Sequence, residues 1–216
     1  MTILYLDTET VASTRPDVVA RIAAKHFDAS DLEGSAAKAA EALEKTALDP
    51  LFGELVCVSL AVDEGEPWTV VRDMRDPSGE RALLQSFAQE LRDIQGDVPR
   101  GEGLQIVAHN APFDRGFLRE RSLIKAVDMP RIVSATGLKP WESSWICTMQ
   151  LFRDDPRGRV SLDDLCFALG LPGKDGVDGS KVGELVRAGR LADVAAYCAG
   201  DVRRVRSCHL RMRGVR

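Results

Sequence analysis

The order of segments along the chain predicts an α/β protein with a mixed sheet. Two apolar stretches, 55–62 and 68–71, are joined by the turn-forming sequence Asp63-Glu64-Gly65-Glu66-Pro67, which is typical of an antiparallel hairpin. From residue 79 on, helix-like and strand-like segments alternate, as they do in α/β proteins. Because the chain has 216 residues, of which 44% are hydrophobic and 29% charged, we expect a single domain, 1–216, with one well-packed core.

The first apolar run, residues 3–6, predicts a strand. It is followed by a segment at about 11–51 that is rich in Ala, with helical spacing over 36–48. Pro16, Gly34 and Pro50 interrupt this segment. We therefore predict a helical insertion at about 11–51, between the first and second strands. We expect this insertion to lie over the domain.

The later segments alternate between helix-like and strand-like spacing of apolar residues. Apolar residues recur at helical spacing from 83 to 94, and residues 104–108 predict a buried strand. Pro112 suits the first turn of a helix, which we expect to continue to about 126. Ser161 opens a capping-box-like start of a helix that Gly170 ends. We expect an extended stretch at 145–147 and a last helix at about 191–211.

The composition excludes several classes of protein. No apolar run approaches the ~20 residues of a membrane span, and the first residues lack the pattern of a secretory signal, so we expect a cytoplasmic protein without a membrane partner. The cysteines show no Cys-x-x-Cys spacing, which argues against a zinc site or a disulfide scaffold and for buried thiols. They are Cys57, Cys147, Cys166, Cys198 and Cys208.

The charge distribution is uneven. The net charge of −4 is not that of a typical nucleic-acid-binding domain, which carries a basic stripe. Residues 181–216, however, contain nine Lys or Arg against three Asp or Glu, a local excess of six positive charges. This run fits a solvated helix face or a surface that attracts phosphates, and the sequence leaves both interpretations open.

Asp7 and Glu9 stand one residue apart at the end of the first predicted strand. Side chains at i and i+2 of a strand share one face, so both carboxylates point the same way. A hard divalent cation with oxygen ligands accounts for such a pair of like charges. The pair therefore indicates a candidate metal site.

Two further patterns carry acids. Asp114 follows the predicted strand 104–108 and falls in the first turn of the next helix, where the helix dipole favours an acid in any case. Tyr197 and Asp201 are four residues apart, so they lie together at one edge of the apolar stripe of the last helix. Each pattern alone is common in proteins that have no active site there.

Taken in this order, the patterns resemble the three motifs of the DEDD superfamily of 3′→5′ exonucleases, and the tyrosine is typical of the DEDDy branch. The motifs are Asp7-x-Glu9, Asn110-x-x-Phe113-Asp114 and Tyr197-x-x-x-Asp201. The stretch from Ser161 to Lys174, continuing to Cys198, resembles bacterial predicted exonucleases related to the exonuclease domain of family B DNA polymerases. The resemblance spans nearly the whole chain. It implies a ribonuclease H-like α/β fold, a mixed central sheet flanked by helices.

The resemblance also implies roles for the acids. It implies two divalent metal ions, Mg²⁺ or Mn²⁺, which carboxylates select over softer metals. Asp7 would bridge both ions, Glu9 and Asp201 would complete the water-activating site, and Asp114 would serve the leaving-group metal through water. Tyr197 would orient the attacking water, because a phenol with a pKa near 10 is a poor general base at neutral pH.

Four other residues are expected to bind substrate. Thr10 and Asn110 belong to the first and second motifs. Phe113 suits stacking on a terminal base as well as a place in the core. Lys174, in a glycine-rich loop, suits a phosphate contact as well as a solvated loop position.

The function implied is metal-dependent hydrolysis at the 3′ end of DNA or RNA, single-stranded or frayed, with release of nucleoside 5′-monophosphates. The alternatives are a catalytically silent nucleic-acid-binding domain of the same fold and an RNA-specific exoribonuclease. A nuclease that cuts internally, such as a resolvase, is a further alternative, although such acid clusters lack a helix-borne Tyr-x-x-x-Asp. The sequence leaves a polymerase or repair partner open.

Overall fold

The structure, a computed structural model, describes residues 1–153, 155, 158–173 and 179–214. Its strands form one five-stranded sheet in the order β3-β2-β1-β4-β5. The strands are β1 (Thr2–Val11), β2 (Glu54–Val62), β3 (Trp68–Val71), β4 (Leu104–Ala108) and β5 (Trp145–Cys147). Each lies where the apolar pattern predicts a strand, although β1 continues beyond the apolar run because its last half carries the polar residues of the first motif.

The central strand β1 makes the sheet mixed. It pairs antiparallel with β2, where Asp7 lies opposite Ser59, and β2 pairs antiparallel with β3 as a hairpin. On its other side β1 pairs parallel with β4, where Tyr5 lies opposite Val107, and β4 pairs parallel with β5. The carboxyl ends of β1, β4 and β5 therefore meet at one edge of the sheet.

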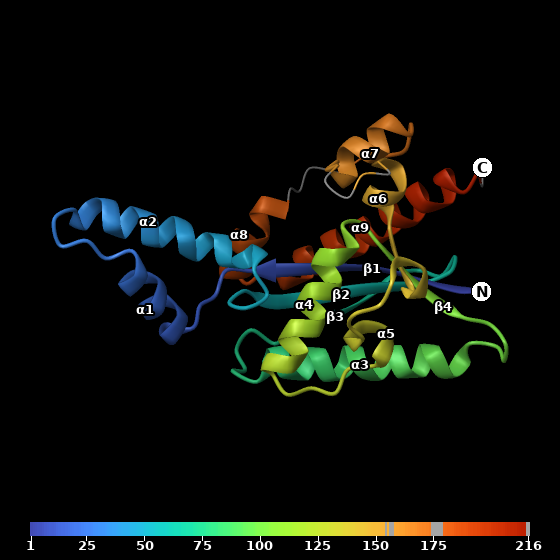
Figure 1. Cartoon of the computed structure of the whole chain (residues 1–216), viewed down its shortest axis with the longest axis horizontal. Helices are drawn as coiled ribbons and strands as arrows, with labels where there is room; N and C mark the ends of the chain where they lie inside the picture. Colours follow the sequence, from blue (N-terminus) through green and yellow to red (C-terminus); the bar gives the residue numbers. More distant parts are fainter. Residues whose placement is uncertain (154, 156–157, 174–178, 215–216) are drawn as a thin grey trace.

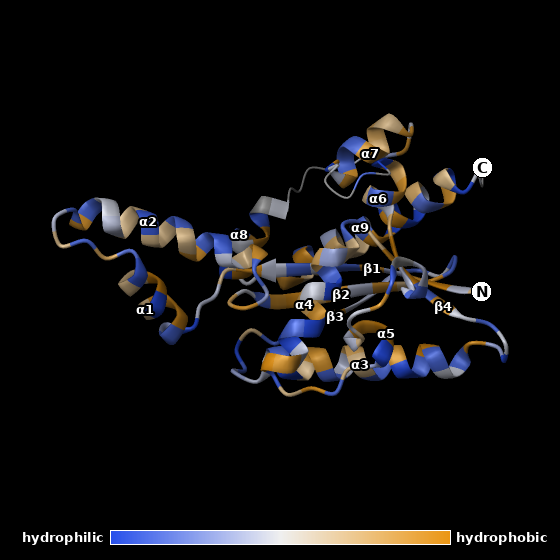
Figure 2. Cartoon of the chain, viewed as in Figure 1, coloured by the Kyte–Doolittle hydropathy of each residue, from blue (hydrophilic) through white to orange (hydrophobic). Residues whose placement is uncertain are grey.

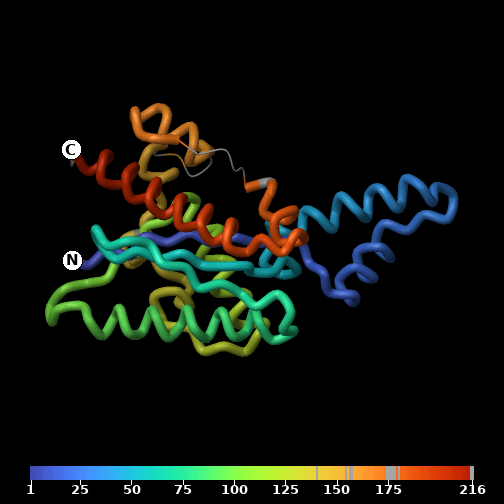
Figure 3. Tube along the Cα trace, turned by 180° about the vertical axis from the view of Figure 1, so that it is seen from behind, coloured from blue at the N-terminus to red at the C-terminus, as the bar shows by residue number. Residues whose placement is uncertain are grey.

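Helices cover both faces of this sheet (Figure 1; Figure 3). The main ones are α3 (Gly79–Asp97) and α4 (Ala111–Ile124) on one face and α9 (Leu191–Met212) on the other. The shorter helices are α5 (Arg131–Ser134), η2 (Pro140–Glu142), α6 (Thr148–Arg153), α7 (Leu162–Ala168), η3 (Gly179–Lys181) and α8 (Val182–Arg187). Gly170 follows α7 in a left-handed conformation (φ 66°), which glycine adopts without strain.

Alternate side chains of β1 pack into two hydrophobic clusters, one on each face of the sheet. Leu4 and Leu6 pack with Phe87 of α3, whereas Tyr5 packs with Val202 and Val205 of α9. This period of two continues past the apolar run. It directs Asp7 and Glu9 towards the α9 side of the sheet and Thr8 towards the α4 side.

The segment between β1 and β2 forms α1 (Pro16–Lys25), α2 (Leu32–Glu44) and η1 (Lys45–Leu48). The expectation that it lies over the domain is wrong, because α1 and α2 project as a hairpin beyond the end of the sheet (Figure 1; Figure 3). Val18 and Ile22 are buried and α1 contacts α2, so the hairpin covers its own apolar stripe. Apolar residues nevertheless remain exposed along it (Figure 2), notably Phe27 and Leu32 at 66% and 64%.

A buried ionic network holds the end of α4 against α3. Glu80 accepts hydrogen bonds from Arg121 at 2.8 and 2.7 Å and from the Leu55 backbone at 3.0 Å, and Lys125 lies 3.0 Å away. Burial acts to raise the pKa of Glu80, but the bonds from Arg121 outweigh it and the pKa is lowered. The network therefore fixes the helix whose other end reaches the candidate site.

The five cysteines are buried free thiols, as the sequence predicts. Within the described residues, no helix combines the length and the apolar character needed to cross a membrane.

Candidate metal centre

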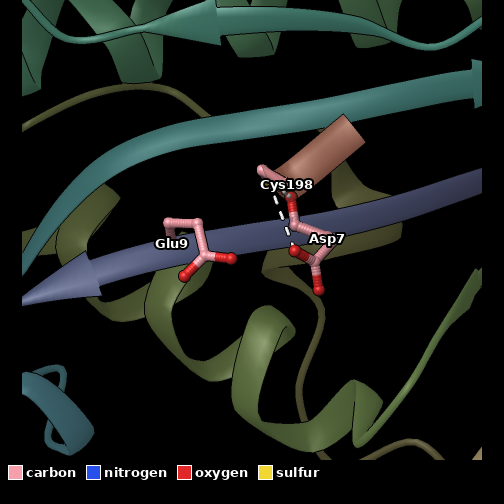
Figure 4. A group of neighbouring side chains, drawn as sticks. All are labelled: Asp7, Glu9 and Cys198. Atoms are coloured by element: carbon pink, nitrogen blue, oxygen red, sulfur yellow. Dashed lines mark hydrogen bonds between the residues drawn. The ribbon is translucent and has the colours of Figure 1, made fainter. Parts of the chain in front are cut away.

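The candidate centre begins with Asp7 and Glu9 on β1, whose carboxylates lie on the same side of the strand (Figure 4). The register with β2 shifts between Glu9 and Thr10, an irregularity that can re-aim a side chain beside an active site. Cys198 of α9 donates to Asp7, at 3.3 Å to Oδ2 and 3.4 Å to the carbonyl oxygen. One ligand atom from each of Asp7, Glu9 and Cys198 lies within 4.8 Å of the others.

Cys198 contributes two hydrogen bonds to Asp7 in this group. Burial, followed by its hydrogen bond with Cys57, raises the pKa of the Cys198 thiol well above its usual range. The thiol therefore keeps its proton, which it shares with Asp7. Carboxylate oxygens remain as the donors, and these suit Mg²⁺ or Mn²⁺. The sequence predicts Cys198 only as one of the buried thiols.

Asp114 reaches the centre from the first turn of α4. It is only 2% exposed, and its Oδ1 accepts hydrogen bonds from Thr8, at 3.1 Å from the backbone nitrogen and 2.8 Å from the hydroxyl. Asn110 makes this approach possible, because its left-handed backbone (φ 57°) turns the chain sharply from β4 into α4, a conformation that Asn tolerates. Burial raises the pKa of Asp114 to about 7, although the bonds from Thr8 lower it.

The carboxylates are close enough to repel one another. The pKa of Asp7 is well above its usual range because of desolvation, followed by the negative charges of Asp114 and Asp201. Asp114 and Asp201 lie outside the tight group of Asp7, Glu9 and Cys198 among the described residues. Asp114 and Asp201 are thus near enough for their charges to act on Asp7, while Thr8 and Arg204 hold their carboxylates.

On α9, Asp201 is 5% exposed and pairs with Arg204. Both Nε and Nη2 of Arg204 donate to Asp201 Oδ1, at 2.9 and 2.5 Å. Sequence analysis missed Arg204 as part of the centre, although an acid and a base at i and i+3 of a helix are neighbours. In the absence of metal, this guanidinium offsets the charge of one predicted ligand.

Tyr197 lies one turn before Asp201, with 8% of its surface exposed. Burial raises its pKa, and the negative charges of Asp201 and Glu9 raise it further. The phenol is therefore protonated at neutral pH and donates a hydrogen bond. A Cβ built on Gly179 would lie 3.4 Å from the Tyr197 hydroxyl, so η3 passes directly over this group.

A groove of about 860 Å³ opens from the centre between β1, α8 and the projecting hairpin, and Glu9, Thr10, Phe113 and Gly179 are in its lining. The Thr10 hydroxyl donates to the Ala47 carbonyl at 2.7 Å, which joins the strand to η1. Phe113 is half-buried and leans on Phe117, with ring centroids 4.9 Å apart.

Other predicted residues have clear positions. His109 holds the local fold, since its two ring nitrogens contact Thr148 Oγ1 and the Val160 carbonyl, each at 2.9 Å. Lys174 lies outside the described residues. In the basic run, Arg203 pairs with Glu66 at 3.0 Å, and Arg206 donates to the Gly65 carbonyl at 2.6 Å. These two arginines tie α9 to the β2–β3 hairpin.

The profile of a family described as predicted 3′-5′ exonucleases related to the exonuclease domain of PolB matches residues 45–216. The chain belongs to this family. The match to the PolB-related exonuclease family includes Asp114, Tyr197 and Asp201 but begins after Asp7 and Glu9, which the sheet brings to the same centre. No curated protein sequence matches the chain.

The fold is shared with part of a solved DNA polymerase structure. The structure of the family B DNA polymerase from the hyperthermophilic archaeon Pyrobaculum calidifontis is similar with a TM-score of 0.62 at 17% identity, over 95% of this chain and 23% of the polymerase. A 3′-exonuclease that recognises the 3′ end of a histone mRNA stem-loop gives a TM-score of 0.45 at 11% identity, over 92% and 65%. This chain thus spans about a quarter of the polymerase. The fold is ribonuclease H-like, as predicted, and family membership supports a nuclease function.

Proposed function

We propose that the chain is a metal-dependent 3′→5′ exonuclease of the DEDDy type. It removes nucleotides from the 3′ end of single-stranded or frayed DNA or RNA and releases nucleoside 5′-monophosphates. The observation that carries the proposal is the gathering of Asp7, Glu9, Asp114 and Asp201 beside a protonated Tyr197. Burial, followed by the charges of Asp114 and Asp201, raises the pKa of Asp7, and such strongly perturbed groups cluster at functional sites.

The donor set fits two divalent metal ions. All four predicted ligands are carboxylates from three elements, β1, α4 and α9, and the neighbouring thiol keeps its proton. Asp7 would be shared by the two ions, Glu9 and Asp201 would hold one, and Asp114 the other. Bound there, such ions supply Lewis acidity and lower the pKa of a bound water towards 7.

The remaining residues position the substrate and the water. Tyr197 keeps its proton because its pKa is raised, so it orients the attacking water as a donor rather than removing a proton from it. Thr8 fixes the Asp114 carboxylate through two hydrogen bonds to one oxygen. Phe113 lines the groove and offers its ring to the terminal base, where stacking carries no sequence preference.

The test uses single-stranded DNA, single-stranded RNA and a mismatched duplex, each labelled at the 3′ or the 5′ end, with Mg²⁺, Mn²⁺ or chelator. An exonuclease releases the 3′ label as a mononucleotide and leaves a ladder of 5′-labelled products. Internal cuts without such a ladder would instead assign the fold to an endonuclease. Comparing the two single strands decides between DNA and RNA.

The matched variants are Asp7→Ala and Asp128→Asn. Asp7→Ala should lower the cleavage rate by more than about 100-fold, the scale of removing one major electrostatic contributor. Asp128, whose side chain is 96% exposed, should give the wild-type rate when replaced by Asn. If folded Asp7→Ala kept more than a tenth of the wild-type rate, the assignment of the centre would be wrong.

A further inference from the structure

A second cleft lies on the other side of the first turns of α4. Its volume is about 400 Å³, and α4, β5 and α6 contribute to its walls. Its lining among the described residues contains arginines and no acid. The polar and aromatic residues that matter here are Arg115, Arg119, Ser143, Trp145 and Gln150. We refer to it as the arginine cleft.

Arg119 lines this cleft, and one of its guanidinium nitrogens is unsatisfied among the described residues. Its Nε is buried and has no hydrogen-bond partner in the described part of the chain. By contrast, Arg115 donates to the carbonyl oxygens of Val133 and Ala135, so α5 and the residue that follows it hold its guanidinium in place. A buried donor without an acceptor is costly. An acceptor from outside the protein, and an anion in particular, would satisfy Arg119.

The position of the cleft relates it to the metal centre. Asp7 is on β1 and Cys147, which lines the cleft, is on β5, with β4 between them. Because neighbouring strands are ~4.8 Å apart, β5 lies about 10 Å from β1 along the same sheet edge. The ~3.4 Å axial rise per phosphate applies to a strand wound into a duplex, and phosphates of an unpaired strand are farther apart, so this span corresponds to fewer than about three phosphates.

The amino end of α4 separates the groove from the arginine cleft. Phe113 lines the groove, whereas its neighbour Pro112 lines the cleft. The helix dipole makes this end of the helix partly positive. A polynucleotide that passes from one cavity to the other crosses a favourable surface for its phosphates.

We propose that the arginine cleft binds a backbone phosphate of the same single strand whose 3′ end lies at the metal centre, upstream of the phosphodiester bond that is cut. The inference rests on the proposed function and deepens it. The planar guanidinium of Arg119 suits two phosphate oxygens, and a contact to the backbone positions any sequence equally. The cleft thereby makes affinity depend on the length of the single strand.

The test measures binding in chelator, so that no cleavage occurs, to a labelled dinucleotide and to a labelled ten-nucleotide single strand. The variants are Arg119→Gln, Arg119→Lys and the control Arg81→Gln, which removes the same charge from an exposed position on α3. Arg119→Gln should weaken binding of the ten-nucleotide strand about fivefold, the scale of one partly exposed ion pair. The slope of log affinity against log salt should fall by about 0.7.

Affinity for the dinucleotide, which is too short to reach the cleft, should stay the same in all variants. Arg119→Lys should restore the salt slope but only part of the affinity, because it keeps the charge and loses the fork. Equal loss for both lengths, or no loss for the longer strand, would overturn the proposal. The proposal would also be overturned if Arg119→Gln abolished binding of inorganic phosphate but left the affinity for the strand unchanged. That result would show a separate anion site.

The outcome is distinguishable from a failure of the proposed function. If the wild type cleaves no labelled strand with Mg²⁺ or Mn²⁺ but Arg119→Gln still loses affinity for the longer strand only, the nuclease proposal fails and the cleft remains a strand-binding site. If the wild type cleaves and the variants bind alike, the cleft proposal fails alone.

Discussion

Replacing Arg204 by Gln should have opposite effects on the protein with and without metal. Arg204 donates two hydrogen bonds to Asp201, and the side chains are only 14% and 8% exposed. Arg204→Gln leaves the Asp201 carboxylate buried among like charges. In the presence of metal, the same change removes a positive charge beside a proposed ligand.

The magnitudes follow from burial. Removing one partner of a buried ion pair costs about 3 kcal/mol, which corresponds to a fall in Tm of about 9 °C at roughly 3 °C per kcal/mol for a chain of this size. In the variant, Mn²⁺ no longer competes with Arg204 for the Asp201 carboxylate, a charge-assisted hydrogen bond of ~1.5 kcal/mol. Mn²⁺ should therefore bind the variant about tenfold more tightly than it binds the wild type. Saturating Mn²⁺ should therefore bring the variant closer to wild type.

The assay is thermal unfolding in chelator and across a Mn²⁺ titration. Arg203→Gln is the matched control, because Arg203 is the adjacent arginine and its pair with Glu66 is exposed, at 50% and 81%, so that its loss costs at most about 1 kcal/mol. If Arg204→Gln melted within about 2 °C of wild type in chelator and bound Mn²⁺ equally, the reasoning would be refuted, and Arg204 would be a solvated residue.

Three further predictions concern the centre. Tyr197→Phe should lower the single-turnover cleavage rate without lowering the Tm, and a wild-type rate would reduce Tyr197 to a packing residue. In chelator, the free energy of unfolding should fall as the pH rises from about 4 to about 7. Burial raises the pKa of Asp114 to about 7 from an ordinary 3.8, so the folded state binds more protons than the unfolded state in this window. A free energy of unfolding, measured with urea, that stayed flat or rose over this pH range would contradict the prediction. Cys198→Ser should keep its affinity for Mn²⁺ in isothermal titration, since the thiol is a donor to Asp7, and a large loss would make the sulfur a ligand.

The sequence predicted the parts of the fold that depend on local pattern. The strands follow from apolar runs and from the hairpin composition at 63–67, and the last helix from its apolar stripe. The insertion was misplaced because its helical spacing reveals an apolar stripe but not the surface that covers it. In the structure α1 and α2 contact each other, and the hairpin projects instead of lying over the domain.

The acids of the site were predictable because their residue types and order are visible in the chain. Their supports were not. Thr8 acts only because β1 packs against α4, and Cys198 acts only because α9 packs against β1. Arg119 gains significance from the packing of β5 and α6 around it. Such roles arise from tertiary contacts between segments that are distant in sequence, so no local spacing announces them.

The alternation along β1 links chemistry to folding. A slip of one residue in the register of this strand would turn Leu6 away from its core. It would also turn the carboxylates of Asp7 and Glu9 to the face that Thr8 occupies. The large free-energy cost of misplacing apolar side chains therefore also fixes the position of the acids. Beyond Glu9 this protection ends, because the register with β2 shifts there. The hairpin of α1 and α2 is inserted after that point, where added length leaves the acids undisturbed. Changes in the length of this hairpin should therefore alter the wall of the groove while sparing the centre, which makes the segment a natural place for relatives to differ.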